Sequence, residues 1–139
     1  MAAQDDPLVV PPESVADVWP RVKRHIQAAC AITGCDVTAH ELRRQCSDPH
    51  GLVRLVMLPG GAAVVEARAE DSAIHVLALG GDALPRDWHL WLSAWLVSVA
   101  RAFGCKRVTL RGRKGWRRKL APLGYREIAL GLLALEVTE

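Results

Sequence analysis

Residues 104–125 read GCKRVTLRGRKGWRRKLAPLGY, and the order of residue types in this stretch predicts the fold of the C-terminal half. Gly104 ends a preceding helix, residues 106–110 predict a strand, and a basic turn containing two glycines leads into a short helix over 114–123. The glycine and tyrosine at its end then open a closing strand or hairpin. All other predicted elements can be placed around this stretch.

Size and composition predict one globular domain. The chain has 139 residues, of which 50% are hydrophobic and 24% charged, and a chain of this size buries roughly two-thirds of its unfolded surface. We expect the domain to span 14–139. Residues 1–13 contain three prolines and no periodicity, so we expect an extended or disordered arm.

The sequence shows no sign of membrane insertion or secretion. No apolar run approaches the ~20 residues of a membrane span, and the first residues lack the basic and apolar segments of a signal peptide. We therefore expect a cytoplasmic protein.

The cysteines predict neither a metal site nor a redox motif. No CxxC pair occurs among Cys30, Cys35, Cys46 and Cys105, and the five histidines form no HxxxH pair. We expect reduced thiols and no metal. A disulfide between Cys30 and Cys35 cannot be deduced from their spacing.

The first half predicts two helices followed by three strands. Apolar residues at helical spacing predict a helix from about Pro20 to Gly34, because proline is unfavourable inside a helix. Thr38 begins a capping box for a short helix that ends near Cys46. Residues 52–58, 62–69 and 73–79 are rich in β-formers and are separated by turn residues, which predicts an antiparallel meander.

A long helix and a final hairpin follow. Residues 85–103 carry a continuous apolar stripe with three tryptophans, which we interpret as core packing. Residues 125–138 predict a strand or hairpin bent at Gly131. The predicted fold class is a single α/β (α+β) domain, with a mixed, mostly antiparallel sheet flanked by helices.

This order of elements resembles the GNAT acyltransferase fold, and LAPLGY (residues 120–125) is similar to the close of many GNAT chains. Small GNAT-like proteins of tailed phages and prophages share further motifs. These are WP (19–20), LGG (79–81), GC (104–105) and the pattern GRxGWxxxLxxxGY (112–125). The resemblance covers residues 18–135.

The resemblance implies a place for acyl-CoA, in a glycine loop before the long helix. The candidate cofactor-binding residues are Leu79, Gly80, Gly81, Arg113 and Lys114. The loop here reads LGGDALPRDW and lacks the family's R/QxxGxG/A spacing, Asp82 adds negative charge, and Pro85 has no N–H to donate. We expect a degenerate acyl-CoA site.

In the family that this chain resembles, a tyrosine donates a proton at the position where this chain has Leu120. By the same alignment, Arg113 and Trp116 lie near the positions of the family's asparagine and small residue. Leucine donates no proton, so we do not expect acetyl transfer by the family's usual route. Candidate general bases are Glu66, His75 and Asp82. The competing interpretations are a solvated strand residue for Glu66 and a hydrogen-bonded sheet histidine for His75.

Residues 106–119 contain eight basic residues and no acidic one. The run is a solvated surface, a phosphate site for CoA or nucleic acid, or a docking surface for an acidic protein. Trp116 either stacks on a base or anchors the short helix. The candidate interaction patch comprises Arg107, Arg111, Arg113, Lys114, Trp116, Arg117, Arg118 and Lys119.

The preferred functional hypothesis is a non-catalytic phage or prophage protein that acts by binding in virion assembly or as a virion component. Its partner would be another protein, with no cofactor, in the bacterial cytoplasm or packaged in the particle. The alternatives are an acetyl-CoA-dependent N-acyltransferase and a small nucleic-acid-binding module.

Overall fold

The computed structural model describes residues 7–33, 37–112 and 115–137. The described strands form a single seven-stranded sheet in the order β1-β2-β3-β4-β5-β7-β6. The strands are β1 (Leu8–Val10), β2 (Val53–Leu58), β3 (Gly61–Arg68), β4 (Ala73–Gly81), β5 (Arg107–Arg111), β6 (Arg126–Ala129) and β7 (Leu132–Glu136). The helices are α1 (Val15–Thr33), α2 (Ala39–Cys46), α3 (Trp88–Ala102) and α4 (Trp116–Leu120), with 3-10 turns at Pro12–Ser14 and Ala121–Leu123.

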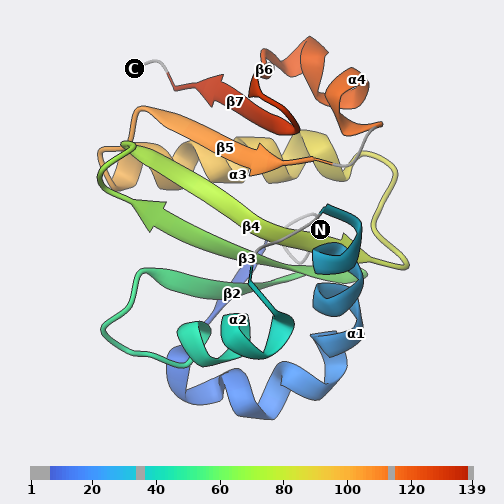
Figure 1. Ribbon diagram of the computed structural model, residues 1–139, viewed down its shortest axis with the longest axis vertical. Coiled ribbons are helices and arrows are strands. Elements are labelled where there is room, and N and C mark those ends of the chain that lie inside the picture. The colour runs from blue at the N-terminus through green and yellow to red at the C-terminus, as the bar shows by residue number, and fades with distance from the viewer. Residues whose placement is uncertain (1–6, 34–36, 113–114, 138–139) are drawn as a thin grey trace, which may run out of the picture.

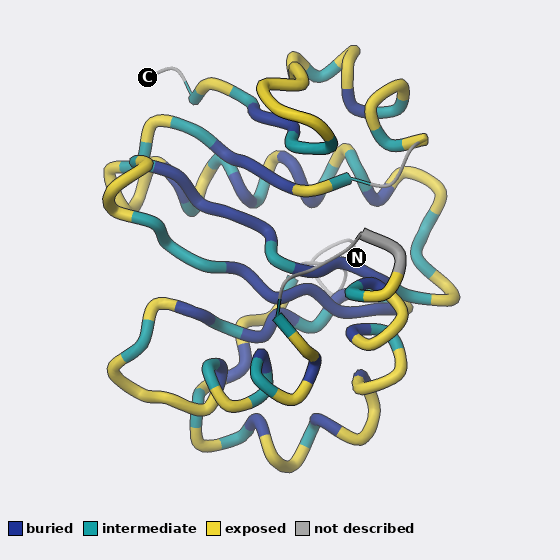
Figure 2. Tube along the Cα trace, viewed as in Figure 1, coloured by how far each residue is buried: buried dark blue, intermediate teal, exposed yellow. Residues whose placement is uncertain are grey.

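Helices cover both faces of this sheet. In Figure 1, α3 lies behind the sheet and α2 in front of it, and α1 packs with α2 on the front face. Two hydrophobic clusters result: Ile26, Leu42 and Leu55 belong to the α1/α2 side, and Ile74 and Leu96 to the α3 side. Figure 2 shows the buried stretches running along the central strands.

The parallel pairing of β4 with β5 positions the site. It extends only from Ala73 opposite Arg107 to Val76 opposite Leu110. Beyond this point β4 continues to Gly81 along β3, whereas β5 continues along β7. A register shift adds to the divergence, because Val64 lies opposite Ala78 but Val65 lies opposite Val76, which is the pattern of a β-bulge. The sheet is therefore open between the ends of β4 and β5.

The predicted meander, the final hairpin and the fold class are confirmed. Thr38 caps α2, since its Oγ1 accepts a hydrogen bond from the Glu41 amide at 3.1 Å. The hairpin turns at Gly131, whose φ of 75° suits glycine. Trp88 belongs to the core, and the tryptophans at 91 and 95 pack against it.

The predicted start of the first helix is wrong. α1 begins at Val15, and Pro20 lies inside it. Val15 and Trp19 are buried at the same spacing as the later core residues of α1. Their burial outweighs the single backbone hydrogen bond that Pro20 removes from the Ala16 carbonyl.

Two further boundaries differ. α3 begins at Trp88, because the Pro85 carbonyl first accepts a hydrogen bond from the Trp88 amide in a turn. Leu8–Val10, within the expected arm, pairs with β2 as an edge strand.

Cys46 and Cys105 are free thiols, and Cys35 lies outside the described residues. Among the described helices, none is long and apolar enough to cross a membrane.

Candidate functional site

The opening between β4 and β5 has a cavity on each face of the sheet. On the α1/α2 side, a cavity of about 260 Å³ is lined by Val37, Leu42, Arg68, His75, Leu77, Arg111 and Leu132; we call it the His75 cavity. Near the start of α3, a cavity of about 300 Å³ is lined by Gly80, Gly81, Asp82, Leu84, Pro85, Arg86, Trp88, Trp116 and Lys119; we call it the tryptophan groove.

Strand register assembles the polar side of the His75 cavity. Glu66 on β3 lies opposite His75 on β4, which lies beside Thr109 on β5. Residues directly opposite one another share a face of the sheet, and so do residues two apart along a strand. Arg68 and Arg111 therefore face the same side as His75.

His75 is a buried, neutral imidazole. It is 5% exposed, and its Nδ1 lies 2.7 Å from Thr109 Oγ1. Burial is the largest cause that lowers the pKa of His75, and together with the positive charges of Arg68 and Arg111 it brings that pKa to about 4. A histidine with so low a pKa binds protons weakly at neutral pH. Its pKa and its hydrogen bond to Thr109 both favour a structural sheet histidine over a general base.

Glu66 is held by an arginine on its own strand. Arg68 Nε donates a hydrogen bond to Glu66 Oε1 at 2.7 Å, and both side chains are about one-third exposed. Arg111 stands at the other side of the cavity, where its Nη1 is 3.4 Å from the Leu130 carbonyl oxygen. Two guanidinium groups and one carboxylate thus surround the neutral histidine.

Asp82 belongs to the other end of β4 and lines the tryptophan groove. It is 61% exposed and accepts a hydrogen bond from Arg24 of α1 at 2.7 Å. The structure therefore brings Glu66 and His75 together but separates Asp82 from them.

Two packed aromatic rings form part of the wall of the tryptophan groove. The rings of Trp88 and Trp116 lie 5.2 Å apart between centroids, and Lys119 Nζ lies 5.6 Å from the centre of the Trp88 ring. Trp116 packs against the α3-side core, as its anchoring interpretation requires. The two tryptophans thereby fasten the start of α3 to α4.

The glycines of this loop are explained by close packing. A Cβ at Gly80 would lie 2.7 Å from the His25 carbonyl oxygen of α1, and a Cβ at Gly81 would lie 2.4 Å from the Gly60 carbonyl oxygen. Leu79, the third residue proposed here for cofactor binding, is 2% exposed in the core. The two glycines allow α1 and the β2–β3 turn to pack closely against β4.

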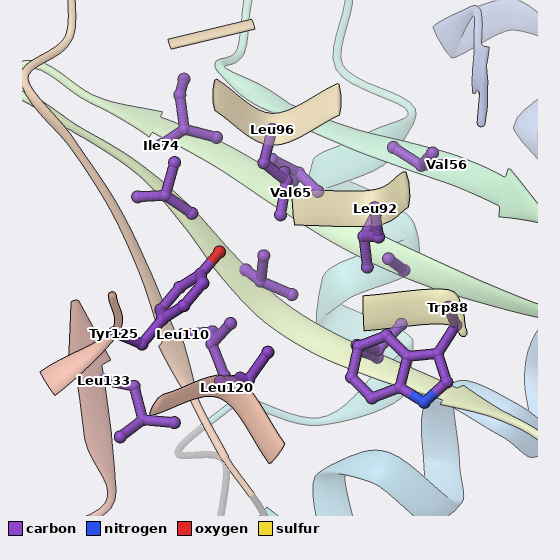
Figure 3. Close-up of a cluster of buried hydrophobic side chains, with 14 of the residues drawn as sticks. Val56, Val65, Ile74, Trp88, Leu92, Leu96, Leu110, Leu120, Tyr125 and Leu133 are labelled. Carbon is purple, nitrogen blue, oxygen red and sulfur yellow. The ribbon is translucent and has the colours of Figure 1, made fainter. Parts of the chain in front are cut away.

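Leu120 occupies a position in the core, with 1% of its surface exposed. Figure 3 shows it beside Leu110 in the α3-side cluster, with Tyr125 nearby. The Tyr125 hydroxyl lies 2.9 Å from Ser93 Oγ, and burial raises the pKa of this phenol. Neither residue lines the tryptophan groove.

The basic run does not form one patch among its described members. Arg107 pairs with Glu136 at 3.4 Å and Arg117 with Glu127 at 2.7 Å. Arg111 lines the His75 cavity, Lys119 lines the tryptophan groove, and Arg118 is exposed on α4. Arg107 and Arg111 share a face of β5 but lie at its two ends, and rotation around α4 points Arg117, Arg118 and Lys119 in different directions. Arg113 and Lys114 lie outside the described residues.

Three residues of the site had no signal in the sequence. Arg68 and Thr109 have ordinary strand positions, and Arg24 lies on the exposed face of an amphipathic helix. Their roles depend on strand register and on the packing of α1 against β4. Neither can be obtained from local periodicity.

The residues of the tryptophan groove do not fit the diphosphate of acyl-CoA well. The Ala83 amide donates to the Gly60 carbonyl, and the Trp88 amide donates to the Pro85 carbonyl. These amides are therefore already used, in a loop where Asp82 adds negative charge and Pro85 has no N–H. Among the described residues, Arg86 and Lys119 are the cations that line this groove.

Comparison with solved structures shows a GNAT fold. The structure is similar to N-acetylglutamate synthase from Neisseria gonorrhoeae, complexed with coenzyme A and N-acetyl-glutamate, with a TM-score of 0.63, 14% identity and 88% of this chain covered. It is also similar to a GNAT-family acetyltransferase from Staphylococcus aureus Mu50, with a TM-score of 0.62, 8% identity and coverage of 96% of this chain and 99% of that one.

A third similar structure is the IAA acetyltransferase from Bacillus cereus, with a TM-score of 0.56, 14% identity and coverage of 94% of this chain and 97% of that one. The chain spans about a third of the Neisseria enzyme. No family model matches the sequence, and no curated protein matches it. At these identities the similarities show the fold alone.

Proposed function

We propose that this chain is a GNAT-fold protein that acts by binding and does not transfer acetyl groups. The observation that supports this function most directly is the contact between Trp88 and Trp116 in the groove next to the buried Leu120. Bulky side chains line the groove, and its described lining contains no tyrosine, cysteine or serine that would protonate a leaving thiolate.

Calorimetry with acetyl-CoA tests the proposal. We expect no binding heat and no thermal shift for the wild-type chain at ligand concentrations up to about 1 mM, which corresponds to only about 4 kcal/mol of binding free energy. Trp116→Ala is the informative variant, because it removes one of the two rings from the groove. Arg118→Ala, an exposed change on the same helix, is the matched control. Micromolar binding of acetyl-CoA by the wild type, with acetyl transfer to a panel of amines, would sink the proposal.

An acetyl-CoA-dependent N-acyltransferase is the second candidate. The observation that favours it is the opening between β4 and β5, which has a cavity on each face. In such an enzyme Arg86 and Lys119 would contact the cofactor's phosphates, and acetyl-CoA would supply the activated acyl group as its thioester. The same calorimetry and transfer assay decides between the two candidates.

The proposed partner is a component of a phage particle. The support is the set of sequence motifs at residues 19–20, 79–81, 104–105 and 112–125. Mass spectrometry of density-gradient-purified particles from a producing strain tests this role. We expect the chain to sediment with the particles, and its confinement to the soluble host fraction would reject packaging.

Nucleic-acid binding is the third candidate function. The ion pairs of Arg107 and Arg117 reduce the charge that these residues offer to phosphate. Filter binding of duplex DNA at increasing salt gives the number of phosphate contacts directly, since the affinity of a backbone-binding protein falls steeply with salt. Binding that is absent or independent of salt would reject this module.

A further inference from the structure

The His75 cavity has the composition of a ligand site. Its aliphatic wall comes from three parts of the chain. These are Val37 before α2 with Leu42 in α2, Leu77 on β4, and Leu132 on β7. Its volume of about 260 Å³ exceeds the ~150 Å³ of an engineered apolar cavity that binds benzene. The cavity therefore has room for a ligand that carries a ring-sized apolar part and a polar group.

The charges around this cavity do not cancel. Arg68 and Arg111 contribute two positive charges, and Glu66, paired with Arg68, contributes one negative charge. The imidazole between them is neutral at pH 7. Among the described residues, the resulting balance of one positive charge complements a single negative charge on a ligand.

The geometry of the polar groups favours a planar anion. Guanidinium groups donate in pairs to carboxylate oxygens. Arg68 donates from its Nε to Glu66, and no bond from its terminal nitrogens to another described residue is found, so these can donate to a ligand. Within the described part of the chain, the His75 ring has one hydrogen bond, through Nδ1 to Thr109, so Nε2 remains as a further polar contact.

We propose that the His75 cavity binds a small monocarboxylate with an aliphatic or aromatic body. Arg68 and Arg111 hold the carboxylate, and the body lies against the aliphatic wall. Inorganic phosphate fits less well, because it carries more than one negative charge near pH 7 and has no body to bury. This ligand class extends the proposed binding function, and it does not depend on whether acetyl-CoA binds at the tryptophan groove.

Isothermal calorimetry with phenylacetate, hexanoate and isovalerate, without acetyl-CoA, tests the proposal. We expect at least one acid to bind, and its neutral amide to bind at least tenfold more weakly, because a hydrogen bond to a charged group is lost. Resonances of the His75 ring should shift on addition of the acid. Equal affinity for acid and amide, no binding by any of the three acids at about 10 mM, or tighter binding of phosphate would overturn the proposal.

Charge variants separate a built site from general attraction. Arg111→Met keeps much of the side chain's length. It should lower the affinity for the acid that binds most tightly at least tenfold. Glu66→Gln raises the local charge and should tighten binding of a dicarboxylate such as succinate relative to the wild type. Arg118→Met, whose residue does not line the cavity, should leave the affinity within about twofold.

The variants must be folded for these comparisons, which far-UV circular dichroism and a cooperative thermal transition establish. Because Glu66→Gln predicts a gain, it cannot be mistaken for unfolding. Equal weakening by Arg111→Met and Arg118→Met would show non-specific attraction and overturn the site. An acetyl-CoA result contradicts only the non-catalytic function, whereas the carboxylate result contradicts only this site.

Discussion

The two cavities beside the β4–β5 opening differ in how their space is used. In the tryptophan groove two aromatic rings pack against each other, glycines accept close backbone contacts, and a leucine of the adjoining core is almost fully buried. In the His75 cavity each described polar side chain of the lining has a hydrogen-bond partner: Thr109 for His75, Glu66 for Arg68 and the Leu130 carbonyl for Arg111.

The two sides of one opening between strands therefore differ in their chemistry within the same sheet. Aromatic packing is favourable wherever rings replace water, because each buried ring contributes a large apolar area. Buried charges and imidazoles are costly unless they are paired. The paired polar groups at the His75 cavity are therefore more informative about binding than the aromatic wall of the tryptophan groove.

The largest expected effect tests whether the core beside the groove is fully packed. Leu120→Ala should lower the free energy of unfolding by about 3 kcal/mol, because it removes a fully buried side chain and leaves a cavity. Chemical denaturation followed by tryptophan fluorescence measures this loss. Leu130→Ala is the matched control, since Leu130 is 93% exposed and should change stability by less than about 0.5 kcal/mol. Similar results for both variants would mean that Leu120 is not packed.

The second prediction concerns the pH dependence that His75 contributes to stability. The pKa of His75 is about 4 in the folded chain and 6.5 in the reference state, so the unfolded chain binds more protons between these values. Stability is therefore fully present above about pH 7 and falls as the pH decreases towards 4, by about 3 kcal/mol from this group. The groups that face it are Arg68, Arg111 and Glu66.

His75→Asn provides the control for this pH dependence. It retains a polar group beside Thr109 but cannot titrate. Subtracting its pH profile from that of the wild type removes the contribution of surface carboxylates such as Glu41 and Glu127, whose pKa values are also lowered. Parallel profiles for wild type and variant would show that His75 is not buried as a neutral ring.

The sequence predicted elements better than it predicted their neighbours. The meander and the hairpin at Gly131 follow from β-formers and turn residues, which are local signals. The start of α1 could not be predicted in this way, because the burial of Val15 and Trp19 depends on the sheet beneath them. In the same way Arg111 was grouped with a basic run, whereas the pairing of β4 with β5 places it beside His75.

The candidate site shows the same limit. Trp116 as a helix anchor and His75 as a hydrogen-bonded sheet histidine followed from residue type and flanking residues, and the geometry agrees with both interpretations. Arg68 had no such signal, because an arginine in a strand is ordinary until its register with β4 is known.

The third prediction tests the glycines of the groove. Gly80→Ala should lower stability by about 2 kcal/mol, because its Cβ would lie 2.7 Å from the His25 carbonyl oxygen and would push α1 away from β4. Gly115→Ala is the control, since no atom lies within 4 Å of its Cβ position. Thermal unfolding of the pair measures the difference. If Gly80→Ala is as stable as Gly115→Ala, helix packing does not explain this glycine, and access for a phosphate becomes the better explanation.

The smallest expected effect concerns the ion pair at the rim of the groove. Arg24 and Asp82 are 75% and 61% exposed, so water and salt screen their attraction although their atoms are 2.7 Å apart. Arg24→Ala should therefore change stability by no more than about 0.5 kcal/mol, and the change should shrink in 1 M NaCl. Denaturant midpoints at low and high salt give both numbers, with Arg21→Ala on the same helix as the control. A loss above about 1 kcal/mol that persists at high salt would mean that this pair anchors α1 to the loop, and the groove would then be held shut by charge as well as by aromatic packing.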